Sequence, residues 1–123
     1  MKIEVSNGEI IDKLTIICIK MERIKDAAKL ANLKKEHDVL AEASSSIMDK
    51  DNPLYVSLYQ VNSNLWDIED KIRDFERGKD FGKEFVAAAR EVYKKNDLRS
   101  GIKREINIGT SSGLIEEKSY EKY

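Results

Sequence analysis

The feature that most constrains this chain is an unbroken apolar repeat within residues 53–77. Its seven members alternate spacings of four and three residues: Leu54, Leu58, Val61, Leu65, Ile68, Ile72 and Phe75. This spacing places every member on one side of a helix and is typical of a coiled-coil seam. Asn52 can cap the helix, and Pro53 suits its first turn, where the missing N–H of proline has no cost. Residues 53–77 are therefore predicted to form one long helix with a continuous apolar face.

A weaker repeat of the same kind precedes this helix. Its apolar members are Leu30, Leu33, Leu40 and Ile47, while His37 and Ser44 take the two places between them. Asp26 is the expected N-cap, so a helix is predicted over 27–48. A short loop joins two helices of similar length, and such pairs usually fold back on each other. The prediction is an antiparallel hairpin of 27–48 with 53–77.

Two further helices are expected, one near each end of the chain. Ser6 and Glu9 fit a capping box before the strongly apolar stretch 8–25. Asp80 is the expected cap of a fourth helix, predicted to be continuous with an irregularity at Asn96-Asp97. Residues 1–7 are expected to be an extended arm, and 108–123 an extended or loosely ordered tail. The predicted fold is a single all-α domain, residues 1–123, in which the hairpin packs with an N-terminal and a C-terminal helix.

Composition narrows the possible functions. The 22 basic and 23 acidic residues give a formal net charge of −1, which disfavours a general nucleic-acid binder. Cys18 is the single cysteine, so no intramolecular disulfide can form. No uncharged segment is long enough to cross a membrane and no secretion signal is present, so a cytoplasmic protein is expected.

No catalytic motif is present in the sequence. No glycine-rich phosphate loop occurs, and one histidine cannot supply a histidine-rich metal site. Neither a metal ion nor a cofactor is therefore expected, and the sequence leaves open whether the protein is an enzyme.

The charged C-terminal part of the fourth helix is the predicted site. Arginine and lysine side chains four residues apart on a helix can hold a phosphate or carboxylate, arginine as a fork and lysine as a point charge. Basic residues of 8–25 would face the same space if the first and fourth helices are neighbours. The candidate anion-binding residues are Lys13, Lys20, Asn96, Arg99, Lys103, Arg104 and Asn107. The alternative is a solvated helix whose bases are neutralised by Asp97 and Glu105.

A second stripe on 53–77 runs beside the apolar seam. Tyr55, Tyr59 and Trp66 lie on it together with Asn62. Aromatic residues at helical spacing usually serve packing or an interface. The expected partner of this stripe is either the helix 8–25 or a second copy of the chain.

Three stretches of the sequence resemble an uncharacterised family of short helical proteins of bacteria and phages. They are IEVSNGEIIDKLTI, KMERIKDAAKLANLKKE and VYKKNDLRSGIKREIN, the last followed by EEKSY. In some cases these proteins occur near or fused to lipopolysaccharide-type sugar transferases. The resemblance implies no established activity and therefore no catalytic residue. It does imply a shared polar site where the two ends of the chain meet, with a signature of Asn7, Gly8, Glu9, Asp12, Lys13, Asn96, Asp97, Lys103, Arg104, Glu105, Asn107, Glu116, Glu117 and Lys118.

Two functions fit these features of the sequence. The first is a non-catalytic helical interaction or accessory module, a homodimer or bound to a protein partner, linked through the resemblance to surface-polysaccharide assembly. The alternative is an enzyme or binder of a small anionic ligand, a phosphosugar or carboxylate, at the Lys/Arg cluster of the first and fourth helices. Nucleic-acid binding through the same basic residues is the weakest hypothesis, because the net charge opposes it.

Overall fold

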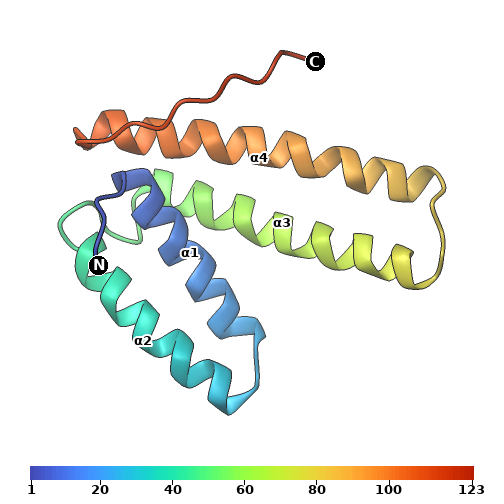
Figure 1. The fold of residues 1–123 in the computed structure, drawn as a ribbon, viewed down its shortest axis with the longest axis horizontal. Coiled ribbons are helices and arrows are strands. Elements are labelled where there is room, and N and C mark those ends of the chain that lie inside the picture. Colours follow the sequence, from blue (N-terminus) through green and yellow to red (C-terminus); the bar gives the residue numbers. More distant parts are fainter.

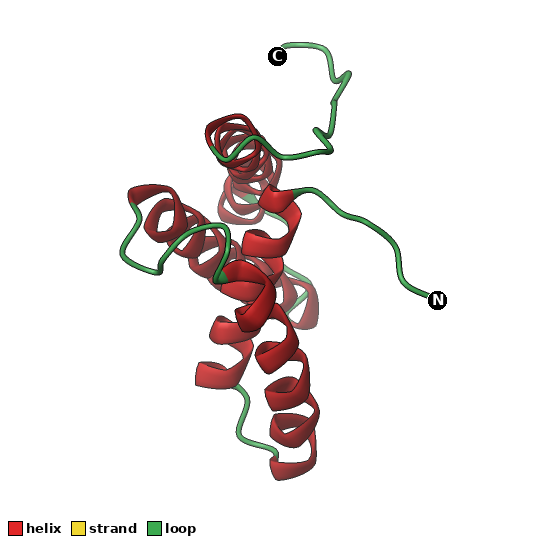
Figure 2. Ribbon diagram, turned by 90° about the vertical axis from the view of Figure 1, so that its left-hand side faces the viewer, coloured by secondary structure: helices red, strands yellow, loops and turns green.

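The chain folds into four helices with no strand. The computed structural model describes all residues, 1–123. The helices are α1 (Asn7–Arg23), α2 (Ala27–Ser44), α3 (Pro53–Arg77) and α4 (Lys83–Gly109) (Figure 1). Residues 1–6 and 114–123 have no regular structure and leave the helices as extended segments, as Figure 2 shows. The all-α class is confirmed.

Helix starts follow the predicted caps in three of four cases. The side chains of Ser6, Asp26 and Asn52 each accept a hydrogen bond from a first-turn backbone N–H, and Pro53 opens α3. The prediction for Asp80 was wrong. Its carboxylate accepts from the N–H of Gly82, and Gly82 itself is the N-cap of α4, without a side-chain bond.

Two helices also differ from expectation, one in its end and one in its continuity. The helix predicted over 27–48 ends at Ser44, where three consecutive serine hydroxyls each donate to the carbonyl three residues earlier. Such local bonds compete with helix continuation. The irregularity expected at Asn96-Asp97 is absent, because α4 continues without a break to Gly109.

The predicted hairpin of the second and third helices is wrong in its pairing. α2 packs against α1, and α3 packs against α4, while no close backbone approach joins α2 to α3. α1 lies in the middle and contacts all three other helices (Figure 1). A heptad pattern specifies which face of a helix is buried but not which helix covers it. α4, longer than α2 and apolar at Ile102 and Ile106, covers the α3 seam instead.

The hydrophobic core lies at one end of the α3–α4 pair, around α1. Each of these three helices contributes two or three side chains, and α2 adds partly buried ones. The buried cluster consists of Ile11, Leu14, Ile17, Tyr55, Leu58, Val61, Ile102 and Ile106. Burying a side chain of this size stabilises the fold by about 1.5–3 kcal/mol. We call this end, formed by α1 with residues 53–62 and 102–109, the joint.

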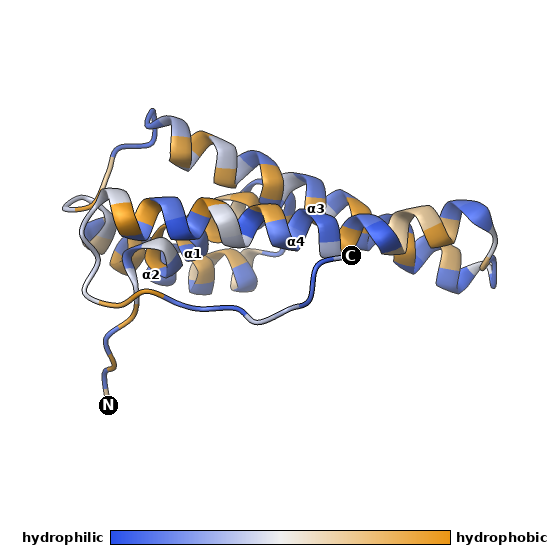
Figure 3. Ribbon diagram, turned by 90° about the horizontal axis from the view of Figure 1, so that it is seen from above, coloured by the Kyte–Doolittle hydropathy of each residue, from blue (hydrophilic) through white to orange (hydrophobic).

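The rest of the α3–α4 pair, residues 63–101, projects beyond α1 and α2, and we call it the arm. Ala88 is the single buried residue in the arm. Apolar and polar residues alternate along it, and no other element covers its far end (Figure 3). Phe75, Phe81 and Phe85 stack edge to face near its tip. None of the four helices has the length and apolar composition needed to cross a membrane.

Candidate functional site

A buried carboxylate, Asp12, is the centre of a polar cluster inside the joint. It lies on α1 among isoleucines and is fully buried. Arg99 of α4 donates to both of its oxygens, from Nε at 2.9 Å and from Nη2 at 2.5 Å. Asn62 of α3 donates to Asp12 Oδ1 at 2.9 Å and to the hydroxyl of Thr15 at 2.8 Å. One carboxylate therefore ties three helices together.

A second charged group lies one helical turn away, around Lys103 of α4. Its Nζ is 2.6 Å from Glu9 Oε2, 3.9 Å from Asp12 Oδ2 and 3.7 Å from Glu116 Oε2. Glu116 belongs to the C-terminal tail and also accepts a hydrogen bond from Ser6 at 2.7 Å. The first turn of α1, the last turns of α4 and the tail thus meet at one lysine.

α1 and α4 can meet this closely because residue 8 is glycine. A Cβ at Gly8 would lie 2.5 Å from the carbonyl oxygen of Lys103 and 3.0 Å from Oδ1 of Asn107. The buried Asn107 side chain accepts from the backbone N–H of Gly8 at 2.6 Å. Next to it, Asn7 donates to Thr110 and Ser112. These bonds satisfy N–H groups that the start of a helix leaves without partners.

The electrostatics of the cluster are balanced. The hydrogen bond to Asp12 raises the pKa of Arg99 above its ordinary value, against the opposing effect of burial. Burial acts to raise the pKa of Glu9, but its hydrogen bond with Lys103 and the lysine charge outweigh this, and the net pKa is lowered. Every buried side-chain nitrogen or oxygen has a hydrogen-bond partner. The buried polar groups of the cluster therefore find their hydrogen-bond partners within the protein, as is usual for a structural network.

The structure brings together only some of the predicted anion-binding residues. Lys103 and Asn107 lie in the joint, and the side chain of Arg99 reaches into it from the adjoining turn of α4. Asn96 accepts a 3.4 Å hydrogen bond from Arg99. Lys13 lies outside this group, where it faces the other oxygen of Glu9 at 3.5 Å. Lys20 lies on a separate groove, with Trp66 and Arg99. Arg104 points away from the joint to Glu117 of the tail, at 2.9 Å.

The aromatic stripe of α3 faces α1, which settles its nearest partner within one chain. Tyr55 is buried with its hydroxyl 3.8 Å from the sulfur of Cys18, and burial raises its pKa. Tyr59 donates to the carboxylate of Glu22, which raises its pKa. Trp66, at the start of the arm, lies under the guanidinium of Arg23 at 5.6 Å. Tyr55 and Tyr59 thus hold α1 on α3.

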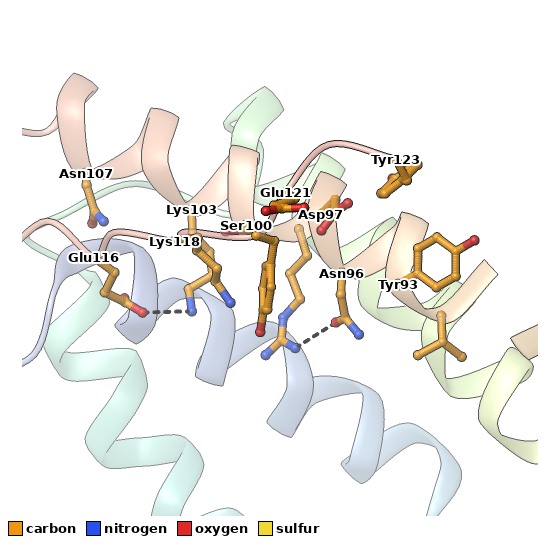
Figure 4. A pocket seen from close by; sticks show the side chains of 13 residues that line it. Tyr93, Asn96, Asp97, Ser100, Lys103, Asn107, Glu116, Lys118, Glu121 and Tyr123 are labelled. Carbon is orange, nitrogen blue, oxygen red and sulfur yellow. Dashed lines mark hydrogen bonds and ion pairs between the residues drawn. The ribbon is translucent and has the colours of Figure 1, made fainter. Parts of the chain in front are cut away.

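A groove of about 660 Å³ runs between α4 and the C-terminal tail (Figure 4). Its α4 side presents Asn96, Arg99, Ser100 and Lys103. Its tail side presents Glu116, Lys118, Tyr120, Glu121 and Tyr123. Cations, carboxylates and tyrosine rings therefore line one continuous space next to the joint. No group of three or more His, Cys, Asp and Glu side chains is placed to hold a metal ion.

Comparison with known proteins places the chain in a family. A model of a family of unknown function, DUF6165, matches residues 1–123. The chain belongs to the DUF6165 family. The predicted membership of an uncharacterised family is thus confirmed, while its link to bacteria, phages and sugar transferases stays a prediction. No curated protein and no solved structure matches the chain.

Several site residues of this DUF6165 chain were not found from the sequence. Thr15 and Asn62 complete the Asp12 cluster, and only the polarity of Asn62 within an apolar stripe indicated a buried role. Tyr93 of α4 and Tyr120 and Tyr123 of the tail line the groove. No pattern predicted this, because the tail has no periodic structure that would show which side of α4 it lies on. Their shared signal was a concentration of tyrosines with charged residues near the C-terminus.

Proposed function

We propose that the protein is a helical interaction module that pairs with a second copy of itself through the arm. The observation that carries the proposal is burial: residues 63–101 contain one buried residue, Ala88, although the arm is rich in large apolar side chains. Its half-buried or exposed apolar residues include Leu65, Trp66, Ile68, Ile72, Phe75, Phe81, Phe85, Val86 and Val92.

Two helices alone cannot bury such a set. Each helix of a hairpin covers one side of its neighbour and leaves the remaining apolar side chains in contact with water. Phe81 is 51% exposed and Val86 is 50% exposed. A second α3–α4 hairpin laid against the first would complete a four-helix bundle around these side chains, with the usual heptad packing.

The charges of the arm favour a second copy as the partner. Residues 66–77 of α3 hold five acidic and three basic side chains, and residues 83–95 of α4 hold four basic and two acidic ones. The α3 half therefore carries a net charge of −2 and the α4 half +2. In a two-fold symmetric pair, α3 of each chain can lie against α4 of the other, so that opposite charges meet twice.

Sedimentation equilibrium across a concentration series tests this proposal with substitutions at the exposed Val86 of α4. Val86→Lys is expected to weaken dimerisation about tenfold, because it buries a charge in the interface. Val86→Asp should weaken it further, on the order of a hundredfold, since it would face the negative α3 of the partner. Val39→Asp, on the exposed face of α2, is the matched control and should change nothing. A parent chain that stays monomeric up to about 0.1 mM would overturn the proposal.

A second candidate function, binding or conversion of a small anionic ligand, is favoured by a separate observation. The groove beside Arg99 and Lys103 also holds Lys118, which has no carboxylate within ion-pair distance. Inorganic phosphate is expected to raise the melting temperature, and Lys118→Ala should reduce that rise. Lys122→Ala, elsewhere on the tail, is the control. A parent protein whose melting temperature does not respond to phosphate would exclude this function.

An accessory role in surface-polysaccharide assembly stays a prediction that rests on the sequence resemblance alone. A structural role for the charged cluster is supported by its hydrogen bonding, because every buried side-chain nitrogen and oxygen atom in it has a partner within the protein.

A further inference from the structure

The C-terminal tail spans the groove as an arch held at both ends. At one end, Glu116 accepts from Ser6 and lies 3.7 Å from Lys103. At the other end, the ring of Tyr123 packs edge to face on Tyr93 of α4, with 5.1 Å between centroids. The groove lies between these two fixed points, with α4 as its floor (Figure 4).

One end of this groove already holds an anion. The carboxylate of Glu116 lies beside the ammonium of Lys103 and receives the hydroxyl of Ser6. The Glu116 side chain is 47% exposed and the Lys103 side chain 15% exposed, so Glu116 is the more easily displaced partner. A phosphate monoester carries more negative charge and more acceptor oxygens than a carboxylate and suits the same donors.

The middle of the groove offers a surface for a ring. Tyr120 of the tail lines it, and Lys118 Nζ lies 5.6 Å from the centroid of the Tyr120 ring. Tyrosine faces stack on flat or C–H-rich rings, whether these belong to a nucleobase or a sugar. Asp97 of α4 and Glu121 of the tail, which also line the groove, supply acceptors for hydroxyl groups.

We propose that the groove binds a phosphate monoester carried on a ring, with the phosphate replacing Glu116 at Lys103 and the ring lying on Tyr120. The inference rests on the second candidate function, anion binding, and adds the class of ligand and the role of the tail. A sugar phosphate and a nucleoside monophosphate share this chemistry.

Titration calorimetry on the full chain with inorganic phosphate, glucose 6-phosphate and AMP tests the ligand class. At least one ring compound is expected to bind about tenfold more tightly than inorganic phosphate, the advantage of one stacked ring. Whichever ring compound binds more tightly than inorganic phosphate shows whether the preferred ring is a sugar or a base. If none of the three probes binds, the anion-binding function itself is excluded. Equal affinity of all three leaves anion binding in place and overturns the ring site.

Two exposed tail residues test the assigned contacts without disturbing the core. Tyr120→Ala should reduce the advantage of the ring compound to below about threefold and leave inorganic phosphate binding unchanged. Glu116→Gln should tighten every phosphate probe about threefold, because the competing charge is gone. Glu117→Gln makes the same change one residue away, at Arg104, and should have no effect. Weaker binding by Glu116→Gln, or an unchanged ring advantage in Tyr120→Ala, would contradict the proposal.

Discussion

The joint and the arm are built from the same two helices, yet they are stabilised in opposite ways. In the joint, α1 packs on α3 and α4 and carries both members of the apolar cluster and the fully buried Asp12. In the arm, α3 packs mainly on α4, and charged residues form exposed pairs such as Arg73–Glu69. The joint thus holds polar groups that are buried and satisfied, whereas the arm holds apolar groups that are uncovered.

This difference shows that the same type of residue has different energetic weight in the two regions. A buried ion pair with several hydrogen bonds cannot lose one member without leaving an uncompensated charge. An exposed pair exchanges with water and contributes little. Matched substitutions, one in each region, measure the difference directly.

The largest single loss of stability is expected in a comparison of two aspartates. Asp12→Ala should destabilise the protein by about 3 kcal/mol, because Arg99 loses both bonds and Asn62 loses one inside the joint. Asp67→Ala, which removes the exposed partner of Arg23, should cost less than about 1 kcal/mol. Urea denaturation of both variants gives the two values. Similar losses of stability in the two variants would show that the hydrogen bonds of Asp12 do not hold α1, α3 and α4 together as the structure indicates.

A smaller loss of stability, set against a gain, is expected for two glycines. Gly8→Ala should destabilise by about 2 kcal/mol, since its Cβ meets the backbone oxygen of Lys103 and α1 must shift away from α4. Gly101→Ala, inside α4 with nothing within 4 Å of the added Cβ, should stabilise by up to about 1 kcal/mol through helix propensity. Thermal unfolding followed by circular dichroism measures both. A neutral or stabilising Gly8→Ala would show that α1 and α4 are not in close contact.

The smallest contrast concerns pH. The pKa of Glu9 lies below its ordinary value of 4.5, because the bond and charge of Lys103 outweigh the effect of burial. A carboxylate with a lowered folded-state pKa contributes stability above about pH 4.5, and this is lost as the pH falls through the lower value. Glu9→Gln should therefore flatten the fall in melting temperature between about pH 6 and pH 3, an effect on the order of 0.5 kcal/mol.

The control for that experiment is Glu69→Gln in the arm, where the carboxylate forms an exposed pair with Arg73. It should leave the pH profile of the parent protein almost unchanged. A profile flattened equally by both substitutions would place Glu9 among ordinary surface charges.

Local features of the fold were predictable from the sequence. The apolar repeat defined α3 from Pro53 to Arg77, and the caps at Ser6, Asp26 and Asn52 defined three helix starts. These signals succeed because capping bonds and the helical period depend on residues only a few positions apart. The helix pairing was not predictable in the same way, because the seam of α3 fits any long apolar helix equally well.

Two basic residues of the charged cluster were predictable from the sequence, but the cluster's full composition and arrangement were not. Sequence reasoning pointed to Arg99 and Lys103 as a positive cluster, and the structure places Asp12, Glu9 and Glu116 against them. Those carboxylates come from residues that are 87, 94 and 13 positions away along the chain. A pattern read along the sequence cannot reveal which charges cancel, since the pairs form only when α1 and the tail dock on α4.

Four helices, most of their ends and their apolar faces are predictable from the amino-acid order alone, because they follow from local bonds and from periodicity. The tertiary structure decided that α1, and not α2, fills the space beside α3 and α4. Gly8 allows α1 to approach Lys103 closely. As a result, Arg99 and Lys103 of α4 form ion pairs with Asp12 and Glu9 of α1. Where α1 ends, α3 continues into the arm with α4 as its one neighbouring helix, because one 17-residue helix cannot span a 25-residue partner.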